Sequence, residues 1–392
     1  MAQEWLDELC STFGLGSEVT LKRPTLVNVV KLVMELSREK PCNLIIDECQ
    51  EIDFVAPAFW ADLQCIWDLG RDHSHLWLAM SGSIAAAMRH IFDDASEPLF
   101  GRQDLSLVLQ PFPPALLREI FLDFSPQGSP DDLLVFYAIT GGIARYVTFL
   151  AESTPLTREG LVNLVFSPEG GFLRSDGATL LANEFRLESP LNEGILRAVA
   201  GGATKWSELV QSQNGQNISG CMDRLEKRYG LLRKVTPLFS DSPKGGCYEI
   251  RDPYLRFWFR FIEPLKFQTL AERGNWSMLR RLCLADLDHF TSRTLEEWFR
   301  EIYIASPQWT QIGRWWDRQG RNEIDLVALN ELDGCSEIAE VKRNPAKIDL
   351  GQLRVKAAAF EQVAGRFLKR MGTPQLRGLS LEDLLKNPQT AN

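Results

Sequence analysis

The sequence predicts an α/β protein built from several domains, and three features of the chain support this prediction. Helical and strand patterns alternate over residues 27–83, where a short apolar run ends in Asp47 and Glu48. Residues 190–250 read as three short helices followed by two strands. Residues 290–343 read as a helix followed by three strands that carry acids and a lysine. Helix and strand patterns that alternate in this way are typical of parallel sheets covered by helices.

Composition narrows the class of protein. A chain of 392 residues suggests two to four domains, and its 45% hydrophobic and 24% charged content is ordinary for a globular protein. No apolar run approaches the ~18 residues of a membrane span, and the acidic N-terminus lacks a signal-peptide pattern. The eight cysteines include no Cys-x2-Cys pair, so we expect a cytoplasmic protein without disulfides or a zinc ribbon. A net charge of −9 argues against a generally basic nucleic-acid coat, although it allows a local basic patch.

The first domain is expected to be a parallel sheet with its helices. The pattern predicts helices at 27–39 and 59–69, and strands at 43–47, 76–83 and 105–109. Asp47 ends the first of these strands and Glu48 follows it, at the carboxyl end where open α/β sheets bind ligands. This is the layout of a Walker B element, in which the first acid holds Mg²⁺ and the second polarises water against a nucleotide phosphate.

Two further residues are candidates for the nucleotide site. Ser83, in Ser81-Gly-Ser83 at the next strand end, is placed to reach a γ-phosphate, but Ser-Gly-Ser is also a common turn. Arg102 is either a phosphate-sensing arginine or a surface ion-pair partner. No Gly-x4-Gly-Lys-Ser/Thr phosphate loop occurs in the chain, and Gly14-Leu-Gly16-Ser17 is not one. Backbone amides of that loop give most of the phosphate affinity, so we expect ATP to bind weakly or not at all.

The middle of the chain is expected to be helical and then to form a winged helix. Residues 114–180 read as helices with loops, including a turn at Thr140-Gly-Gly142. Three helices follow, and strands at 231–235 and 247–250 complete a winged helix-turn-helix pattern. Its basic cluster consists of Arg224, Lys227, Arg228, Arg233, Lys234 and Lys244. The cluster either faces DNA phosphates, or the module serves interdomain or protein contacts. The aromatic residues at 253–262 predict a core helix rather than a base-stacking platform.

The C-terminal pattern predicts a metal site. Glu296 lies on a helix, Asp325 on a strand, and Glu340 and Lys342 on the next strand. Residues two apart in a strand share a face, so Glu340 and Lys342 project together. We expect Asp325 and Glu340 to bind a divalent cation, with Glu296 completing the site and Lys342 facing a scissile phosphate. Alternatively, Glu297 replaces Glu296, or the strands form an inert, self-neutralised hairpin; Glu323 shares a face with Asp325 as a further acid.

The order of these units resembles a prokaryotic family of AAA+/STAND-like ATPases with a C-terminal DUF234-type PD-(D/E)xK nuclease module. The resemblance is carried by Leu44-Ile-Ile-Asp-Glu48, Ser81-Gly-Ser83, Leu99-Phe-Gly-Arg102, Thr140-Gly-Gly142, Tyr248-Glu-Ile-Arg-Asp252, Phe257-Trp-Phe259, Trp315-Trp316, Glu323-Ile-Asp325 and Glu340-Val-Lys342. It implies a truncated ATPase core at 1–112, a helical lid at 113–185, a winged helix at 186–265, a restriction-endonuclease-like α/β module at 280–372 and a tail at 373–392.

The resemblance also implies Mg²⁺ or Mn²⁺ and ATP as cofactors, with Asp47 and Glu48 in the Walker B roles. Because the family's first strand and phosphate loop are missing, either the true start lies upstream, the gene is split or decayed, or nucleotide binding has been lost. We expect an ATPase-family protein that acts on DNA and hydrolyses phosphodiesters at its C-terminal site. The alternative is a non-enzymatic regulator that binds DNA or protein. DNA is the expected partner, with a protein partner or a second copy as alternatives, and no membrane is involved.

Overall fold

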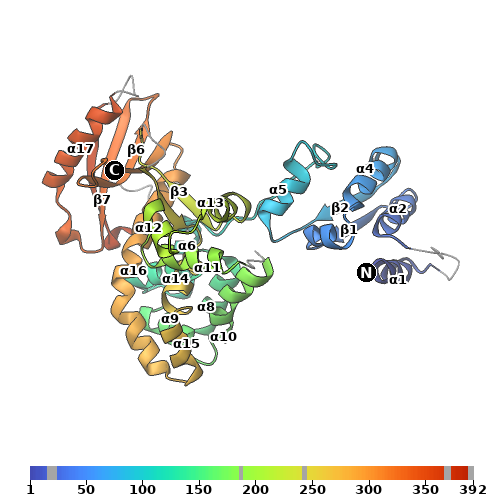
Figure 1. Ribbon diagram of the computed structural model, residues 1–392, viewed down its shortest axis with the longest axis horizontal. Coiled ribbons are helices and arrows are strands. Elements are labelled where there is room, and N and C mark those ends of the chain that lie inside the picture. Colours follow the sequence, from blue (N-terminus) through green and yellow to red (C-terminus); the bar gives the residue numbers. More distant parts are fainter. Residues whose placement is uncertain (16–23, 185–188, 241–244, 366–371, 387–392) are drawn as a thin grey trace. The chain divides into compact units, whose positions relative to one another are not determined.

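The computed structural model shows a mixed α/β protein of two compact units (Figure 1). It describes residues 1–392 except 16–23, 185–188, 241–244, 366–371 and 387–392. The first unit contains residues 1–108 together with 227–229, and the second contains 109–226 and 230–392. No helix in the described parts of the chain is long and apolar enough to cross a membrane.

The first unit is built around two parallel strands. Its elements are α1 (Ala2–Phe13), α2 (Leu26–Leu36), β1 (Cys42–Ile46), η1 (Cys49–Glu51), α3 (Ile52–Val55), α4 (Phe59–Gly70), η2 (Arg71–His73), β2 (Leu76–Met80) and α5 (Ala85–Asp93). The strands pair in register from Cys42 with Leu76 to Ile46 with Met80, which confirms the predicted parallel arrangement. Val30 of α2 and Leu63 of α4 pack with Ile46 in one apolar core. Because the strands are parallel and in register, their carboxyl ends lie side by side.

The strand predicted at 105–109 is not formed, and this prediction was wrong. Residues 105–113 have no regular secondary structure, and Leu105, Leu107 and Leu109 are exposed. The apolar residues at every second position gave the strand pattern. A strand also needs a hydrogen-bonded neighbour, and β1 and β2 pair only with each other in the described part of this unit.

The second unit begins with a group of helices around α7. They are α6 (Pro114–Phe124), α7 (Pro130–Thr140), α8 (Ala144–Ser153), α9 (Arg158–Val165) and α10 (Gly171–Thr179), followed by a π-helical turn at Leu180–Glu184. Ser129 and Asp132 form a capping box that begins α7, which is buried from Leu133 to Thr140. Gly141 and Gly142 end it with positive φ angles of 59° and 77°, as the sequence predicted. A Cβ atom on Gly142 would lie 2.5 Å from the carbonyl oxygen of Phe112, so glycine is required there.

Three helices and a strand pair follow in the predicted order. They are α11 (Pro190–Ala200), α12 (Trp206–Ser212), α13 (Ser219–Asp223), a π-helical turn at Arg224–Arg228, β3 (Leu232–Val235) and β4 (Cys247–Ile250). The two strands are antiparallel and pair from Leu232 with Ile250 to Val235 with Cys247. The aromatic segment forms α14 (Pro253–Phe261), whose Phe257, Phe259 and Phe261 are buried, so the predicted core helix is confirmed.

The C-terminal part is a four-stranded sheet between two helices. After α15 (Leu265–Glu272) come the 30-residue α16 (Trp276–Ala305), β5 (Gln311–Trp316), β6 (Glu323–Asn330), β7 (Cys335–Lys342), η6 (Pro345–Lys347), α17 (Leu350–Ala364), β8 (Gln375–Ser380) and η7 (Leu381–Asp383). The strand order is β5-β6-β7-β8, with β8 parallel to β7 and the other pairs antiparallel.

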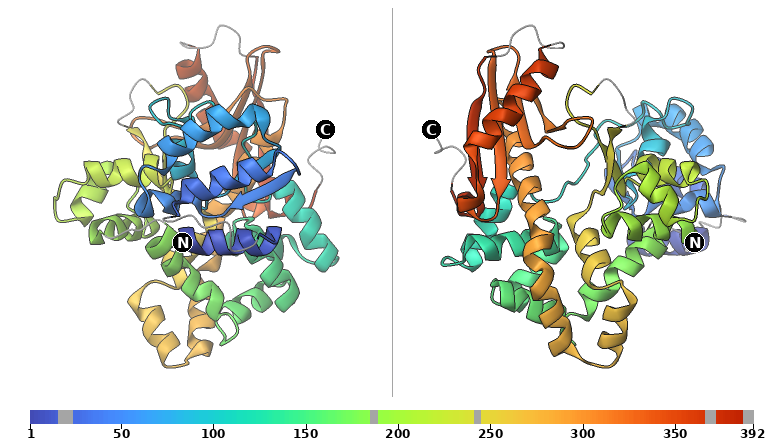
Figure 2. Two further views of the ribbon diagram at one scale, coloured as in Figure 1. Left: turned by 90° about the vertical axis from the view of Figure 1, so that its right-hand side faces the viewer. Right: turned by 60° about the vertical axis from the view of Figure 1, so that its left-hand side comes forward.

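The two helices cover opposite faces of this sheet. Ile338 of β7 packs in a core with Leu353 and Phe360 of α17, and Figure 2 shows α17 running along the sheet. The adjacent Glu337 accepts a hydrogen bond from Tyr303 of α16. Adjacent residues of a strand point to opposite faces, so α16 lies on the other side. Residues 375–380, which the sequence assigned to a tail, form the edge strand β8, because β7 offers them a partner.

Candidate functional site

The carboxyl ends of β1 and β2 bring the first set of predicted residues together. Asp47 Oδ1 accepts hydrogen bonds from the backbone N–H of Glu48, at 3.0 Å, and from the Ser81 hydroxyl. Glu48 Oε2 accepts hydrogen bonds from the Ser83 hydroxyl, at 2.9 Å, and from the Gln50 side-chain amide. The two acids therefore lie against the two serines, and the Walker B roles of Asp47 and Glu48 and the sensor role of Ser83 stay predictions.

The loop after β1 is tightly built. Glu48 has a positive φ of 49°, which is uncommon for a residue other than glycine. Gln50 is buried, and its Oε1 accepts no hydrogen bond in the described structure. A Cβ atom on Gly82 would lie 2.3 Å from that oxygen, so only glycine allows the Ser81–Ser83 turn to approach so closely. Glu48 is thus held in place by the turn that follows β2.

Arg102 is engaged away from these acids. Its Nε and Nη2 donate to the two carboxylate oxygens of Asp68, on α4, at 2.9 and 2.7 Å. Its Nη1 donates to the carbonyl oxygens of Pro98 and Phe100. The hydrogen bonds from Arg102 lower the pKa of the Asp68 carboxyl. Of the two roles open to Arg102, the structure contains the surface ion pair.

The C-terminal candidate residues meet at the ends of β6 and β7. Asp325 Oδ2 accepts hydrogen bonds from Lys342 Nζ, at 3.0 Å, and from the backbone N–H of Val341, at 2.9 Å. Lys342 Nζ also lies 3.6 Å from Glu340 Oε1. The oxygens of Asp325 and Glu340 that share this ammonium, at 3.0 and 3.6 Å, are therefore at most about 6.6 Å apart.

The charge of Lys342 is secured by its position. Although burial works against the ammonium form, Asp325 and Glu340 raise the pKa of Lys342. The lysine therefore stays protonated and balances the two carboxylates that flank it. This is the geometry that the strand alternation predicted for Glu340 and Lys342.

Glu296 approaches this site from α16. Burial and the charge of Asp325 raise the pKa of Glu296 to about 7, and Arg314, at 3.6 Å, opposes the shift. Glu297 points elsewhere: it pairs with Arg233 at 2.7 Å and with Arg300 at 3.3 Å. Glu296 therefore feels the charge of Asp325, whereas Glu297 is paired with arginines, and the role of Glu296 in a metal site stays a prediction.

Lys356 is a member of the site that the sequence interpretation missed. Its Nζ lies 3.2 Å from Glu340 Oε1. It lies on α17 three residues after Leu353 and four before Phe360, both of which are buried against the sheet. A lysine on the apolar face of a helix was the signal that could have found it.

A buried cluster of arginines and glutamates joins the β3–β4 pair to α16 and β5. Glu249 on β4 pairs with Arg233 at 3.1 Å, with Arg314 at 3.0 Å and with Arg293. Burial opposes its ionisation, but these three arginines lower the pKa of Glu249 to about 2. Arg233, counted in the basic cluster from sequence alone, therefore faces the interior, because two buried carboxylates, Glu249 and Glu297, hold it there.

The other basic residues of this region are placed differently. Lys227 and Arg228 are exposed, and Arg224 and Lys234 are half-buried. Lys234 Nζ lies 5.7 Å from the ring centre of Tyr248. Lys244 lies outside the described residues.

The acidic residues do not form a closed metal cage. Within the described ranges, no group of three or more His, Cys, Asp or Glu side chains is arranged to hold a metal ion. Asp325 and Glu340 therefore offer two carboxylate ligands, and water or substrate oxygens would supply the rest. Mg²⁺ commonly binds through one or two carboxylates, so the donor set fits this ion.

Comparison with known proteins finds similarity to a family model, to an archaeal protein and to a solved structure. Residues 258–350 match DUF234, described as archaea bacterial proteins of unknown function, which supports the DUF234 resemblance, predicted for residues 280–372. The uncharacterized protein MJECL04 of Methanocaldococcus jannaschii is 26% identical over 309 residues, which cover 76% of this chain and 67% of that protein. The Walker-type ATPase PABY2304 of Pyrococcus abyssi is similar in structure, with a TM-score of 0.44 and 18% identity over 65% of this chain and 75% of that chain.

Proposed function

We propose that this chain is an ATPase-family protein that acts on DNA, and that its C-terminal module hydrolyses phosphodiester bonds with the help of a divalent metal ion. The observation that carries the proposal is the position of Lys342 between Asp325 and Glu340, at 3.0 and 3.6 Å. Two carboxylates and a lysine at neighbouring strand ends are the groups that metal-assisted phosphodiester hydrolysis needs.

Each side chain has a role in this chemistry. Asp325 and Glu340 hold the ion, which when bound polarises the phosphate and lowers the pKa of a water molecule. Lys342 donates to a phosphate oxygen where negative charge develops. In the reaction, the water oxygen bonds to phosphorus and keeps one proton, the bond from phosphorus to one sugar oxygen breaks, and the other proton of the water ends on that sugar oxygen.

A plasmid assay tests the proposal. Supercoiled DNA is incubated with the protein and Mg²⁺ or Mn²⁺, and nicked product is measured. We expect metal-dependent nicking that is lost in Asp325→Asn and Glu340→Gln, because each change removes a ligand charge. Glu331→Gln, which alters an exposed acid just after β6, is the matched control and should nick like the unaltered protein. Nicking that survives both site substitutions would contradict the proposal.

A second candidate function has its own supporting observation. Asp325 and Glu340 are already balanced by Lys342 and Lys356 without any cation. Such a site is stable without a metal, which suits a non-enzymatic regulator that binds DNA or protein through its other surfaces. DNA binding without nicking, together with calorimetric titrations that detect no Mn²⁺ binding, would favour this function over hydrolysis.

The first unit adds a nucleotide site to the proposal. Asp47 would hold Mg²⁺ and Glu48 would polarise water, and both side chains are already positioned by Ser81 and Ser83. Since the sequence contains no phosphate loop, these residues would contact the metal and the γ-phosphate only. We therefore propose weak nucleotide binding by this chain.

A further inference from the structure

Glu340 is surrounded by more positive charge than one carboxylate needs. Its Oε1 lies 3.2 Å from Lys356 Nζ and 3.6 Å from Lys342 Nζ. Its Oε2 accepts a hydrogen bond of 3.2 Å from the backbone N–H of Asp349, the N-cap residue of α17. Lys342 and this helix end already stabilise the charge of Glu340, which is only 6% exposed. The Glu340 carboxylate is therefore stable without Lys356, and the presence of Lys356 needs another explanation.

The net charge of the site suggests a role for Lys356. Asp325 and Glu340 carry two negative charges, and Lys342 and Lys356 carry two positive charges, so the site is balanced without a metal ion. One divalent cation would leave a net charge of +2, which attracts a phosphodiester anion. A second cation would lack ligands of its own, because no group of three or more His, Cys, Asp or Glu side chains in the described residues is arranged to hold a metal ion.

We infer that Lys356 is a second phosphate-binding residue of this site and acts there in place of a second metal ion. This inference rests on the proposed phosphodiester hydrolysis. Once a metal ion takes the Glu340 carboxylate, the Lys356 ammonium loses its partner and turns on its flexible stem to an oxygen of the bound phosphate. The side chain is 22% exposed, so it reaches both the carboxylate and the solvent from which DNA enters.

The two states of Lys356 predict opposite effects of one substitution. Without DNA, the ammonium competes with a metal ion for Glu340, so its removal should tighten metal binding. With DNA bound, the ammonium stabilises the phosphate, so its removal should slow hydrolysis. A lysine that only supports the fold would instead lower thermal stability, metal affinity and rate together.

The test compares four proteins in three measurements, and thermal unfolding gives the melting temperature. Calorimetry with Mn²⁺ in the absence of DNA gives metal affinity, and plasmid nicking at saturating Mn²⁺ gives the rate. For Lys356→Met we expect a Kd for Mn²⁺ that is several-fold lower and a nicking rate about 10- to 100-fold lower. Lys356→Arg keeps the charge and should restore most of the rate. Arg354→Met, an exposed position on the same helix, should match the unaltered protein in all three.

The outcomes separate this inference from the proposed function. Nicking by Lys356→Met at the unaltered rate would overturn the inference alone. Joint loss of melting temperature, Mn²⁺ affinity and rate in this variant, with no rescue by arginine, would also overturn it, because the lysine would then be structural. Absence of nicking by the unaltered protein would overturn the proposed function and this inference with it.

Discussion

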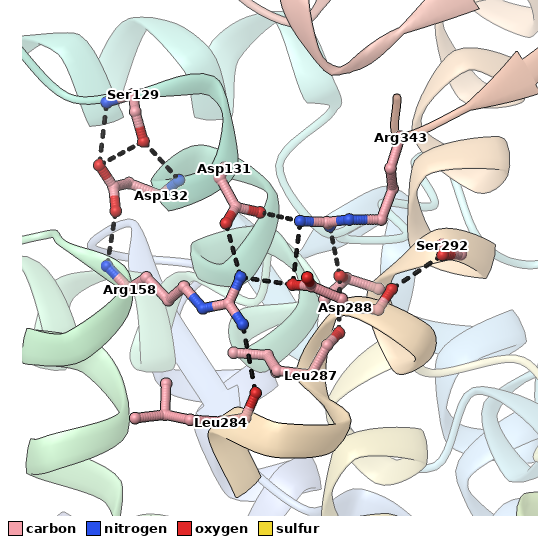
Figure 3. A network of polar contacts seen from close by, with 10 residues as sticks. Ser129, Asp131, Asp132, Arg158, Leu284, Leu287, Asp288, Ser292 and Arg343 are labelled. Atoms are coloured by element: carbon pink, nitrogen blue, oxygen red, sulfur yellow. Dashed lines mark hydrogen bonds and ion pairs between the residues drawn. The ribbon is translucent and has the colours of Figure 1, made fainter. Parts of the chain in front are cut away.

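Arg343 and Asp131, which are 212 residues apart in the sequence, form an ion pair with an Nη2–Oδ1 distance of 2.5 Å (Figure 3). Arg343 also donates to the Thr291 hydroxyl at 2.6 Å and to Asp288 at 3.3 Å, both on α16. Arg158, at the start of α9, contacts the same two aspartates. Because Arg343 directly follows Lys342, this network ties the end of β7 to α16, which carries Glu296, and to α7 and α9.

Loss of the Arg343 ion pairs and hydrogen bonds should destabilise the second unit. Arg343→Met leaves the half-buried Asp131 with one arginine fewer, so we expect the free energy of unfolding to fall by about 2 kcal/mol. Urea unfolding followed by circular dichroism measures the change. Arg102→Met removes an ion pair at the surface of the first unit and should cost less than about 1 kcal/mol. Equal effects of the two substitutions would show that the Arg343 network is no stronger than a surface pair.

Glu296 should make stability depend on pH. Its pKa is raised to about 7 by burial and by Asp325, whereas an unfolded glutamate titrates at about 4.3. The folded state therefore holds the proton more tightly, and the resulting stabilisation is complete below the unfolded pKa and is lost as the pH rises through about 7.

The measurement for Glu296 is urea unfolding at several pH values from 4 to 8. Glu296→Gln removes the titrating group. Between the unfolded and folded pKa values of Glu296, the free energy of unfolding should therefore decline less with rising pH in the variant than in the unaltered protein. An identical pH profile for both proteins would mean that Glu296 titrates normally in the folded state.

Nucleotide binding should be weak. Asp47 and Glu48 are positioned at the end of β1, but the sequence lacks a phosphate loop to supply backbone amides to the phosphates. Calorimetric titration with ATP and Mg²⁺ should give no binding or a Kd in the millimolar range. Micromolar affinity that disappears in Asp47→Asn would contradict this and would reveal another phosphate-binding segment.

DNA binding through the three-helix and strand-pair region should depend on its exposed and half-buried basic residues. Reversal of charge in the double variant Arg228→Glu/Lys234→Glu should weaken binding to all sequences alike, because phosphate contacts carry no sequence information. Each lost contact should reduce the slope of log K against log salt by roughly 0.9.

Fluorescence anisotropy with two unrelated duplexes over a range of salt concentrations measures this binding. Lys266→Glu, on α15, is the control for a charge reversal outside this region. Affinity and salt slope that are unchanged in the double variant would assign this region to protein contacts.

The sequence by itself determined those features that depend on local pattern. Apolar runs and their acidic ends placed β1 and Asp47-Glu48, and parallel pairing followed from the alternation of helices and strands. The period of two in a strand predicted that Glu340 and Lys342 share one face. In the structure, Lys342 contacts both Glu340 and Asp325. Dense aromatic residues predicted that α14 is buried. These properties are local because backbone geometry sets which residues share a face.

Only the tertiary structure decided which faces meet. It placed Lys356 beside Glu340 and paired Arg343 with Asp131. It also turned Arg233 toward the buried Glu297, and it gave Glu296 and Glu297 different partners. At the level of strands, it paired β8 with β7 and left residues 105–109 exposed and without a partner strand. Each of these outcomes depends on which segments, far apart in the chain, lie close together in space. Lysine and arginine have long side chains, so they can form ion pairs with any acid that the fold brings within reach. Periodicity reports the direction in which a side chain leaves the backbone, but packing of whole helices and sheets decides what it reaches.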